Sequence, residues 1–200
     1  MISQLVRKYS QRFLEPVANF ISATKISPNA ITIIGFLLMI IVAFVLAKGD
    51  FLWGGILITA FALFDALDGT LARMTKRTSR FGAFLDSTLD RYAEAIIYLG
   101  LFIYYINQNQ TLELILIYVT VVGSLMVSYA RARAEGIGVP LKDGLFTRFE
   151  RIFVLVVGLL FNWLFGWLTL ALWLLAILSN FTAVQRMYMV WCITYDEESG

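Results

Sequence analysis

Two long stretches without a charged residue constrain the fold more than any other feature of this sequence. Residues Ile26 to Ala47 carry no charge, and neither do the 34 residues from Ile152 to Gln185. An α-helix needs about 20 apolar residues to cross the hydrocarbon core of a bilayer, which is ~30 Å thick. The chain is 60% hydrophobic and only 15% charged, whereas soluble domains have about 25% charged residues. A soluble enzyme and a disordered chain are therefore excluded, and the sequence predicts an integral membrane protein.

The alternation of apolar and polar segments predicts an all-α protein with six transmembrane helices, in one domain over residues 1–200. The first four helices are expected from Ile26 to Ala47, from about Phe51 past Asp65, from about Ser79 to about Asn107, and from about Thr111 to Glu135. Ser27 and Pro28 are typical residues for the start of the first helix. The last uncharged stretch would be ~51 Å long as one helix, so we expect a break near Asn162 to Gly166. The six-helix bundle then covers residues 26–192.

Residues 1–24 have the pattern of a basic amphipathic helix that lies on the membrane surface. Apolar residues such as Leu5 and Phe13 alternate there with basic residues such as Arg7. A cleaved targeting peptide is the alternative. Glu15, Pro16 and the lack of a small-residue cleavage site disfavour it.

The distribution of basic residues predicts how the chain is oriented. With the N-terminus in the cytoplasm, every one of the 16 lysines and arginines except Lys48 falls on the cytoplasmic side of six spans. This distribution agrees with the positive-inside rule. It supports both the number of spans and the orientation.

The rare residue types exclude several chemistries. The chain has no histidine and one cysteine, so it can form no Ser-His-Asp or Cys-His triad, no His-ligated zinc site and no internal disulfide. Acid–base and metal chemistry must therefore use Asp and Glu. The net charge of +2 gives no reason to expect nucleic acid as a partner.

Four aspartates are the candidates for the reactive centre. Asp65 and Asp68 are spaced i, i+3, and Asp86 and Asp90 are spaced i, i+4, so each pair lies on one face of its helix. A short loop joins the two helices, so the pairs can converge. Each aspartate inside a membrane costs about 2.5 to 3.5 kcal/mol, and ion pairs with neighbouring arginines are the structural alternative. Such an oxygen-rich cluster suits two hard divalent cations, Mg²⁺ or Mn²⁺.

Small residues accompany the aspartates. Gly69, Ala72 and Gly82 lie one turn from them on the same helix faces. They would let a phosphate group approach the helix backbone closely. Close packing between membrane helices is the alternative for any one of them.

Residues 65–90 contain the string D-x2-D-G-x2-A-R-x8-G-x3-D-x3-D without a gap, which resembles the signature of the CDP-alcohol phosphotransferases. The resemblance implies that Asp65, Asp68, Asp86 and Asp90 bind two divalent metal ions. It also implies that Asp90 is the general base that takes the proton from the attacking hydroxyl. An enzyme of this kind would be a homodimer in the plasma membrane of a prokaryote, with its active site on the cytoplasmic side.

The same resemblance implies where the CDP-linked lipid binds, whether it is CDP-diacylglycerol or CDP-archaeol. One part of the site lies in the motif, and the other is a segment near the start of the first membrane helix. The residues implied are Asn29, Ala30, Ile31, Thr32, Gly69, Ala72, Arg73, Ser79 and Gly82.

The segments around Arg131, Arg151 and Arg186 resemble the phosphatidylinositol-phosphate synthases and their archaeal archaetidylinositol-phosphate counterparts. In that subgroup three basic residues grip the phosphate of inositol phosphate, and arginine suits bidentate phosphate binding. Arg131 stands where a lysine is common, and Phe149 where a proline is common. The reaction implied transfers the phosphatidyl or archaetidyl group to a hydroxyl of inositol 1-phosphate and releases CMP. The main alternative is glycerol 3-phosphate as acceptor, in a phosphatidylglycerophosphate synthase.

A cation transporter is the alternative from another class of protein. A cation pathway should carry ionisable residues through the middle of the bilayer. In this sequence the charged positions cluster toward one leaflet, and the outer halves of the predicted helices are apolar. The pattern therefore favours an enzyme over a transporter.

Overall fold

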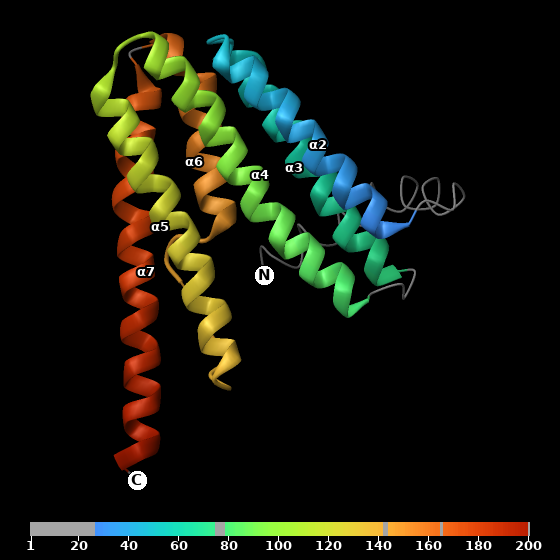
Figure 1. The fold of residues 1–200 in the computed structure, drawn as a ribbon, viewed down its shortest axis with the longest axis vertical. Helices are drawn as coiled ribbons and strands as arrows, with labels where there is room; N and C mark the ends of the chain where they lie inside the picture. The colour runs from blue at the N-terminus through green and yellow to red at the C-terminus, as the bar shows by residue number, and fades with distance from the viewer. Residues whose placement is uncertain (1–26, 75–78, 142–143, 165, 200) are drawn as a thin grey trace, which may run out of the picture. The chain divides into compact units, whose positions relative to one another are not determined.

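The structure is a computed structural model that describes residues 27–74, 79–141, 144–164 and 166–199, with the backbone alone at residues 28, 63–74 and 196–199. All regular elements in this part of the chain are helical (Figure 1): α2 Pro28–Ala47, α3 Phe51–Met74, α4 Arg80–Asn107, α5 Thr111–Gly136, α6 Arg148–Leu160, the 3₁₀ turn η1 Asn162–Leu164, and α7 Trp167–Ser199. The all-α class is thereby confirmed for the described residues. The interfacial helix predicted over residues 1–24 lies outside them.

Local capping signals in the sequence fix several helix ends. The Ser27 hydroxyl accepts the backbone N–H of Ala30 at 3.2 Å, so it caps α2. The long uncharged stretch breaks where the sequence predicts, between Leu160 at the end of α6 and Trp167 at the start of α7. Gly166 adopts a φ of 68°, which favours glycine, and the Asn162 side chain accepts the N–H of Leu168 at 3.3 Å. These residues divide the stretch into two helices.

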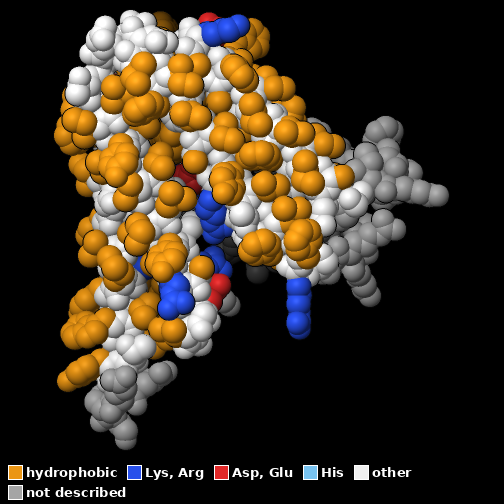
Figure 2. All heavy atoms as spheres, viewed as in Figure 1, with side chains coloured by type: hydrophobic (Ala, Val, Ile, Leu, Met, Phe, Trp, Pro, Cys, Tyr) orange, Lys and Arg blue, Asp and Glu red, His pale blue; other side chains and the backbone are white. Residues whose placement is uncertain are grey.

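Three segments of the described helices are long and apolar enough to cross a membrane: Asn29–Ala47, Thr111–Gly136 and Trp167–Tyr195. Hydrophobic side chains cover much of the face shown in Figure 2, as expected for a surface in contact with lipid. The chain is a membrane protein. The prediction of six spans is not confirmed, because three of the described helices meet this criterion.

The chain divides into two compact units, and each is described by itself. The first consists of Met1–Val42 and Leu57–Ile96, and the second of Ala43–Ile56 and Ile97–Gly200. The first unit therefore contains the four predicted aspartates. The second unit contains the three predicted arginines.

In the second unit α7 packs against both α5 and α6. Gly123 on α5 allows a close approach, because a Cβ there would lie 2.5 Å from Nδ2 of Asn180 on α7. The Asn180 amide donates to the carbonyl oxygens of Val119 at 3.0 Å and Ala176 at 2.8 Å. An amide inside an apolar interface is thus satisfied, and it fixes the register of α7 against α5.

Candidate active site

Asp86 and Asp90 lie one turn apart on α4, in the first unit, as predicted. Asp86 is exposed and Asp90 is half-buried. Ser79 fixes the start of this helix, because its hydroxyl accepts the N–H of Gly82 at 2.9 Å. Glu94, which is not among the predicted residues, lies one turn beyond Asp90 and is 8% exposed. One face of α4 therefore carries acidic side chains over three successive turns.

The other two aspartates, Asp65 and Asp68, lie within α3, together with Gly69, Ala72 and Arg73. The side chains of these five residues are outside the described part of the structure. Among the described side chains, no three of Asp, Glu, His or Cys lie close enough to hold a metal ion. The four-aspartate cluster therefore stays a prediction.

The first turns of α2 and α4 meet in the first unit. A Cβ on Gly82 would lie 2.9 Å from Oδ1 of Asn29 and 3.0 Å from Oγ of Ser79. Three of the residues predicted to bind the CDP-lipid thus lie together, and a side chain at position 82 would crowd the other two. The next three predicted residues, Ala30, Ile31 and Thr32, are half-buried on α2. Their role in binding stays a prediction.

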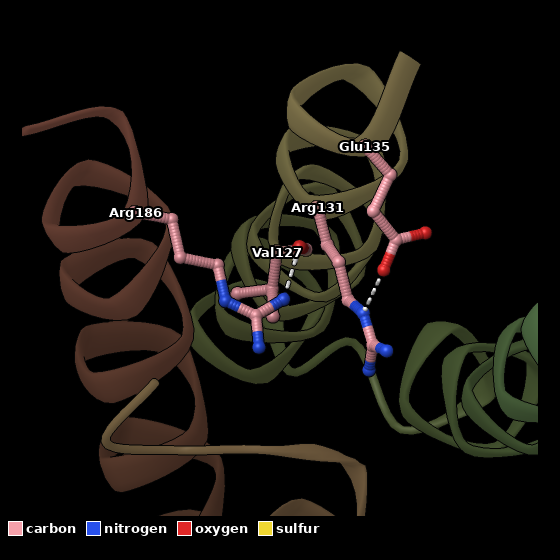
Figure 3. Close-up of polar contacts among 4 residues, drawn as sticks. All are labelled: Val127, Arg131, Glu135 and Arg186. Carbon is pink, nitrogen blue, oxygen red and sulfur yellow. Dashed lines mark hydrogen bonds and ion pairs between the residues drawn. The ribbon is translucent and has the colours of Figure 1, made fainter. Parts of the chain in front are cut away.

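Arg131, Arg151 and Arg186 come from three helices, α5, α6 and α7. Arg151 and Arg186 are only 2% and 4% exposed, whereas the Arg131 side chain is 47% exposed. The guanidinium of Arg186 interacts electrostatically with the charged groups of Arg131, Arg151 and Glu135. Figure 3 shows the Arg186 side chain reaching from α7 toward α5, with the Arg131 guanidinium nearby. The structure therefore brings the three predicted arginines into one positively charged cluster.

The contacts of these guanidinium groups leave donors open to a further ligand. Nη1 of Arg186 donates to the carbonyl oxygen of Val127 at 2.7 Å, while its buried Nε has no hydrogen-bond partner among the described residues. Nε of Arg131 donates to Oε1 of Glu135 at 2.9 Å. An unsatisfied buried donor costs about 1–3 kcal/mol. The positively charged arginine cluster is therefore suited to binding an anion.

A short segment before α6 lies against the arginine cluster. The N–H of Leu145 donates to Oε1 of Gln185 at 3.1 Å, and Nη1 of Arg151 donates to the carbonyl oxygen of Phe146 at 3.4 Å. Gly144 lies beside the Arg186 guanidinium. Neither Gly144 nor Gln185 belongs to the predicted set. Gln185 is adjacent to Arg186 in the sequence, but its partner is 40 residues away, so no local pattern indicates the contact.

The start of α6 is held by a capping box between Thr147 and Glu150. The N–H of Thr147 donates to Oε2 of Glu150 at 2.8 Å, and the Thr147 hydroxyl donates to the same oxygen. The Thr147 hydroxyl is the main cause of a lowered pKa at the Glu150 carboxyl, and burial opposes it. This cap sets the position of Arg151, one residue further along α6.

We expect Thr147→Ala to lower the thermal unfolding midpoint at about pH 7 and to have less effect at about pH 4. The folded-state pKa of Glu150 is below its ordinary value of 4.5, so its stabilising contribution is present above that pH and is lost as pH falls through the folded pKa. Losing the cap at neutral pH should cost about 0.5–2 kcal/mol. The measurement is thermal unfolding of the purified protein in detergent at both pH values.

Thr194→Ala is the control for this prediction, because the Thr194 hydroxyl donates to the backbone oxygen of Val190 and not to a carboxylate. Its effect should be the same at both pH values. An equally pH-independent effect of Thr147→Ala would show that the ionised Glu150 does not stabilise the cap.

Comparison with known proteins identifies the family. A sequence model of the CDP-alcohol phosphatidyltransferases matches residues 25–184. The chain belongs to this family, which confirms the resemblance carried by residues 65–90. It is therefore a CDP-alcohol phosphotransferase.

Two relatives and one solved protein are similar over most of their length. The chain is 39% identical to phosphatidylinositol phosphate synthase of Streptomyces avermitilis, over 95% of this chain and 82% of that protein. It is 38% identical to archaetidylinositol phosphate synthase of Pyrococcus horikoshii, over 94% and 95%. The crystal structure of Mycobacterium tuberculosis phosphatidylinositol phosphate synthase with CDP-DAG bound matches with a TM-score of 0.84 and 31% identity, over 90% of this chain and 94% of that one. A second crystal structure of that protein contains manganese and citrate.

Proposed function

We propose that this protein transfers a phosphatidyl or archaetidyl group from a CDP-linked lipid to a hydroxyl of inositol 1-phosphate and releases CMP. The observation that carries the proposal is the cluster of Arg131, Arg151 and Arg186, two of them almost fully buried. Such a cluster suits an acceptor that already carries a phosphate. The two curated relatives described above are named for the corresponding inositol phosphate products.

For the metal site we propose Asp65, Asp68, Asp86 and Asp90 as the ligands of two divalent ions, Mg²⁺ or Mn²⁺. Carboxylate oxygens are the donors that such hard cations prefer, and the similar mycobacterial enzyme has been crystallised with manganese. When bound, the ions would neutralise charge on the diphosphate and on the departing CMP. Among the described residues, the helical spacing of Asp86 and Asp90 on α4 supports this assignment.

Asp90 is the proposed general base. The acceptor oxygen attacks the lipid-bearing phosphorus of the donor, its proton passes to the Asp90 carboxylate, and the bond from that phosphorus to the CMP oxygen breaks. For this step the carboxylate must come within about 3 Å of the hydroxyl. The proposed role of the arginine cluster is to bind the phosphate of the acceptor.

The donor site is proposed at the start of α2 and along the motif, at the residues predicted above. Its support from the described residues is the contact of Gly82 with Asn29 and Ser79, where a side chain at position 82 would fill the space. A glycine at such a position lets a diphosphate approach the backbone.

The proposed membrane arrangement follows from the basic residues. We propose a six-helix bundle over residues 26–192 in one domain, with the N-terminus and the active site on the cytoplasmic side of a prokaryotic plasma membrane. All Lys and Arg residues except Lys48 then lie on the cytoplasmic side. A homodimer is part of the proposal because of the resemblance to the family.

The test of function is CMP release by the purified protein with Mg²⁺, one donor and one acceptor at a time. The donors are CDP-diacylglycerol and CDP-archaeol, and the acceptors are inositol 1-phosphate, glycerol 3-phosphate, free inositol and serine. We expect CMP only with inositol 1-phosphate. Release with glycerol 3-phosphate alone would instead identify a phosphatidylglycerophosphate synthase. No release with any donor and acceptor would contradict the proposal.

A further inference from the structure

We propose that Gly144 and Gln185 are positioning residues that hold the Arg186 guanidinium in the orientation that binds the acceptor phosphate. The inference rests on the proposed function, since it assigns Arg186 to that phosphate. It adds a backbone segment to the acceptor site, where the resemblance to the family implies only three basic side chains.

The contact between Gly144 and Arg186 is tight. A Cβ on Gly144 would lie 2.9 Å from both Nε and Nη2 of Arg186 and 3.3 Å from its Cζ. Gly144 has an ordinary backbone conformation, so glycine is needed here for space and not for a positive φ. The Gly144 backbone therefore lies next to the Nε–Nη2 edge of the guanidinium, and a side chain at this position would displace that group.

Gln185 holds this segment in place from the same helix that carries Arg186. Its Oε1 accepts the N–H of Leu145 at 3.1 Å, one residue after Gly144. Gln185 and Arg186 are neighbours on α7, so the same helix holds both the segment that begins at Gly144 and the guanidinium next to it. This shared support couples the position of Gly144 to that of Arg186.

The other end of the segment is anchored to α6. The carbonyl oxygen of Phe146 accepts from Nη1 of Arg151 at 3.4 Å, and the Thr147–Glu150 capping box follows directly. The segment of residues 144–147 thus lies between the two buried arginines, with Gly144 beside Arg186 and Phe146 bonded to Arg151. Its anchors are residues that belong to the site or adjoin it.

The orientation of Arg186 is otherwise weakly determined. Among the described residues its only hydrogen bond is the one from Nη1 to Val127, and Nε has no partner. A guanidinium has five N–H donors, so a single bond does not fix the direction of the others. Contact with Gly144 supplies the missing restraint, and binding groups must be held within about 0.5 Å to work well.

Gly144→Ala tests the inference directly. The atoms that a new methyl group would meet are at the far end of a flexible side chain, so the protein should fold and the guanidinium should move. We expect the KM for inositol 1-phosphate to rise about 10-fold or more, with the KM for CDP-diacylglycerol unchanged; a tenfold loss corresponds to about 1.4 kcal/mol. The binding of inositol 1-phosphate without donor, measured by calorimetry, should weaken by a similar factor.

Gly136→Ala is the matched control, because a Cβ on Gly136, at the end of α5, would have no atom of the described residues within 4 Å. It should leave both KM values unchanged. Gln185→Met, which removes the acceptor for the Leu145 N–H but keeps a side chain of similar length, should raise the acceptor KM in the same direction. In an Arg186→Lys background, where the shorter cation avoids the new methyl group, Gly144→Ala should add little.

Two outcomes would overturn the inference in a wild-type protein that uses inositol 1-phosphate. One is an acceptor KM within about twofold of wild type in both Gly144→Ala and Gln185→Met, well below the tenfold step expected. The other is an equal rise in the KM values of donor and acceptor, which indicates a general structural effect. Failure of the proposed function looks different, because the wild-type protein itself would then not use inositol 1-phosphate.

Discussion

Replacing Asp90 with asparagine should reduce CMP release by about 10²- to 10⁴-fold, the range that a general base contributes. The amide has nearly the same shape as the carboxylate, but it cannot take the proton from the acceptor hydroxyl. It is also a poorer ligand for a divalent cation. Asp90 is half-buried on α4, one turn from Asp86. The substitution should therefore change the chemistry of this acidic face of α4 and leave its helical structure intact. The measurement is the initial rate of CMP release at saturating donor and acceptor.

Asp50→Asn is the matched control for this substitution. Asp50 is an exposed aspartate between α2 and α3, in the other unit of the chain. Its activity should equal that of the wild type, and neither variant should change the thermal unfolding midpoint. Wild-type activity in the Asp90→Asn protein would remove Asp90 from the reaction and leave the aspartate motif without its proposed base.

The helix ends could be predicted from the sequence because the interactions that set them are local. The Ser27 hydroxyl caps α2 through the N–H of Ala30, three residues later, and Asn162 and Gly166 lie in the break between α6 and α7. The lengths of the two last helices are harder to predict. The uncharged stretch predicts the break near Asn162 to Gly166, but it does not predict that α6 has 13 residues and α7 has 33.

The same distinction between local and long-range interactions applies to the candidate site. The shared face of Asp86 and Asp90 follows from their spacing, and the grouping of Arg131, Arg151 and Arg186 follows from the resemblance to a family. Neither source gives the contacts that orient those groups. The bond from Arg186 to Val127 joins residues 59 apart in the chain, and it exists because Asn180 and Gly123 set how α7 packs on α5. Such contacts depend on tertiary packing, which a single sequence does not encode locally.

Arg186→Met should separate the acceptor affinity of this protein from its stability. Loss of a charged, hydrogen-bonded contact with phosphate corresponds to about 1.5–3 kcal/mol, so binding of inositol 1-phosphate should weaken by about 10- to 100-fold while binding of the CDP-lipid is unchanged. The thermal stability of the protein without substrate, in contrast, should not decrease. Arg186 is buried near two other arginines, and among the described residues the carboxylate that acts on it is Glu135, which already pairs with Arg131. An apolar side chain of similar length removes both the repulsion and the buried unpaired Nε.

We therefore expect the thermal unfolding midpoint without substrate to stay level or rise in Arg186→Met. Arg133→Met, at an exposed position on α5, should change neither acceptor binding nor the midpoint. A fall of several degrees in Arg186→Met alone would show that Arg186 holds α7 to α5 through Val127, and that its burial serves the fold. A level or higher midpoint with weaker acceptor binding would show that the burial of Arg186 is retained for the acceptor, because binding sites commonly keep charged groups that lower the stability of the free protein.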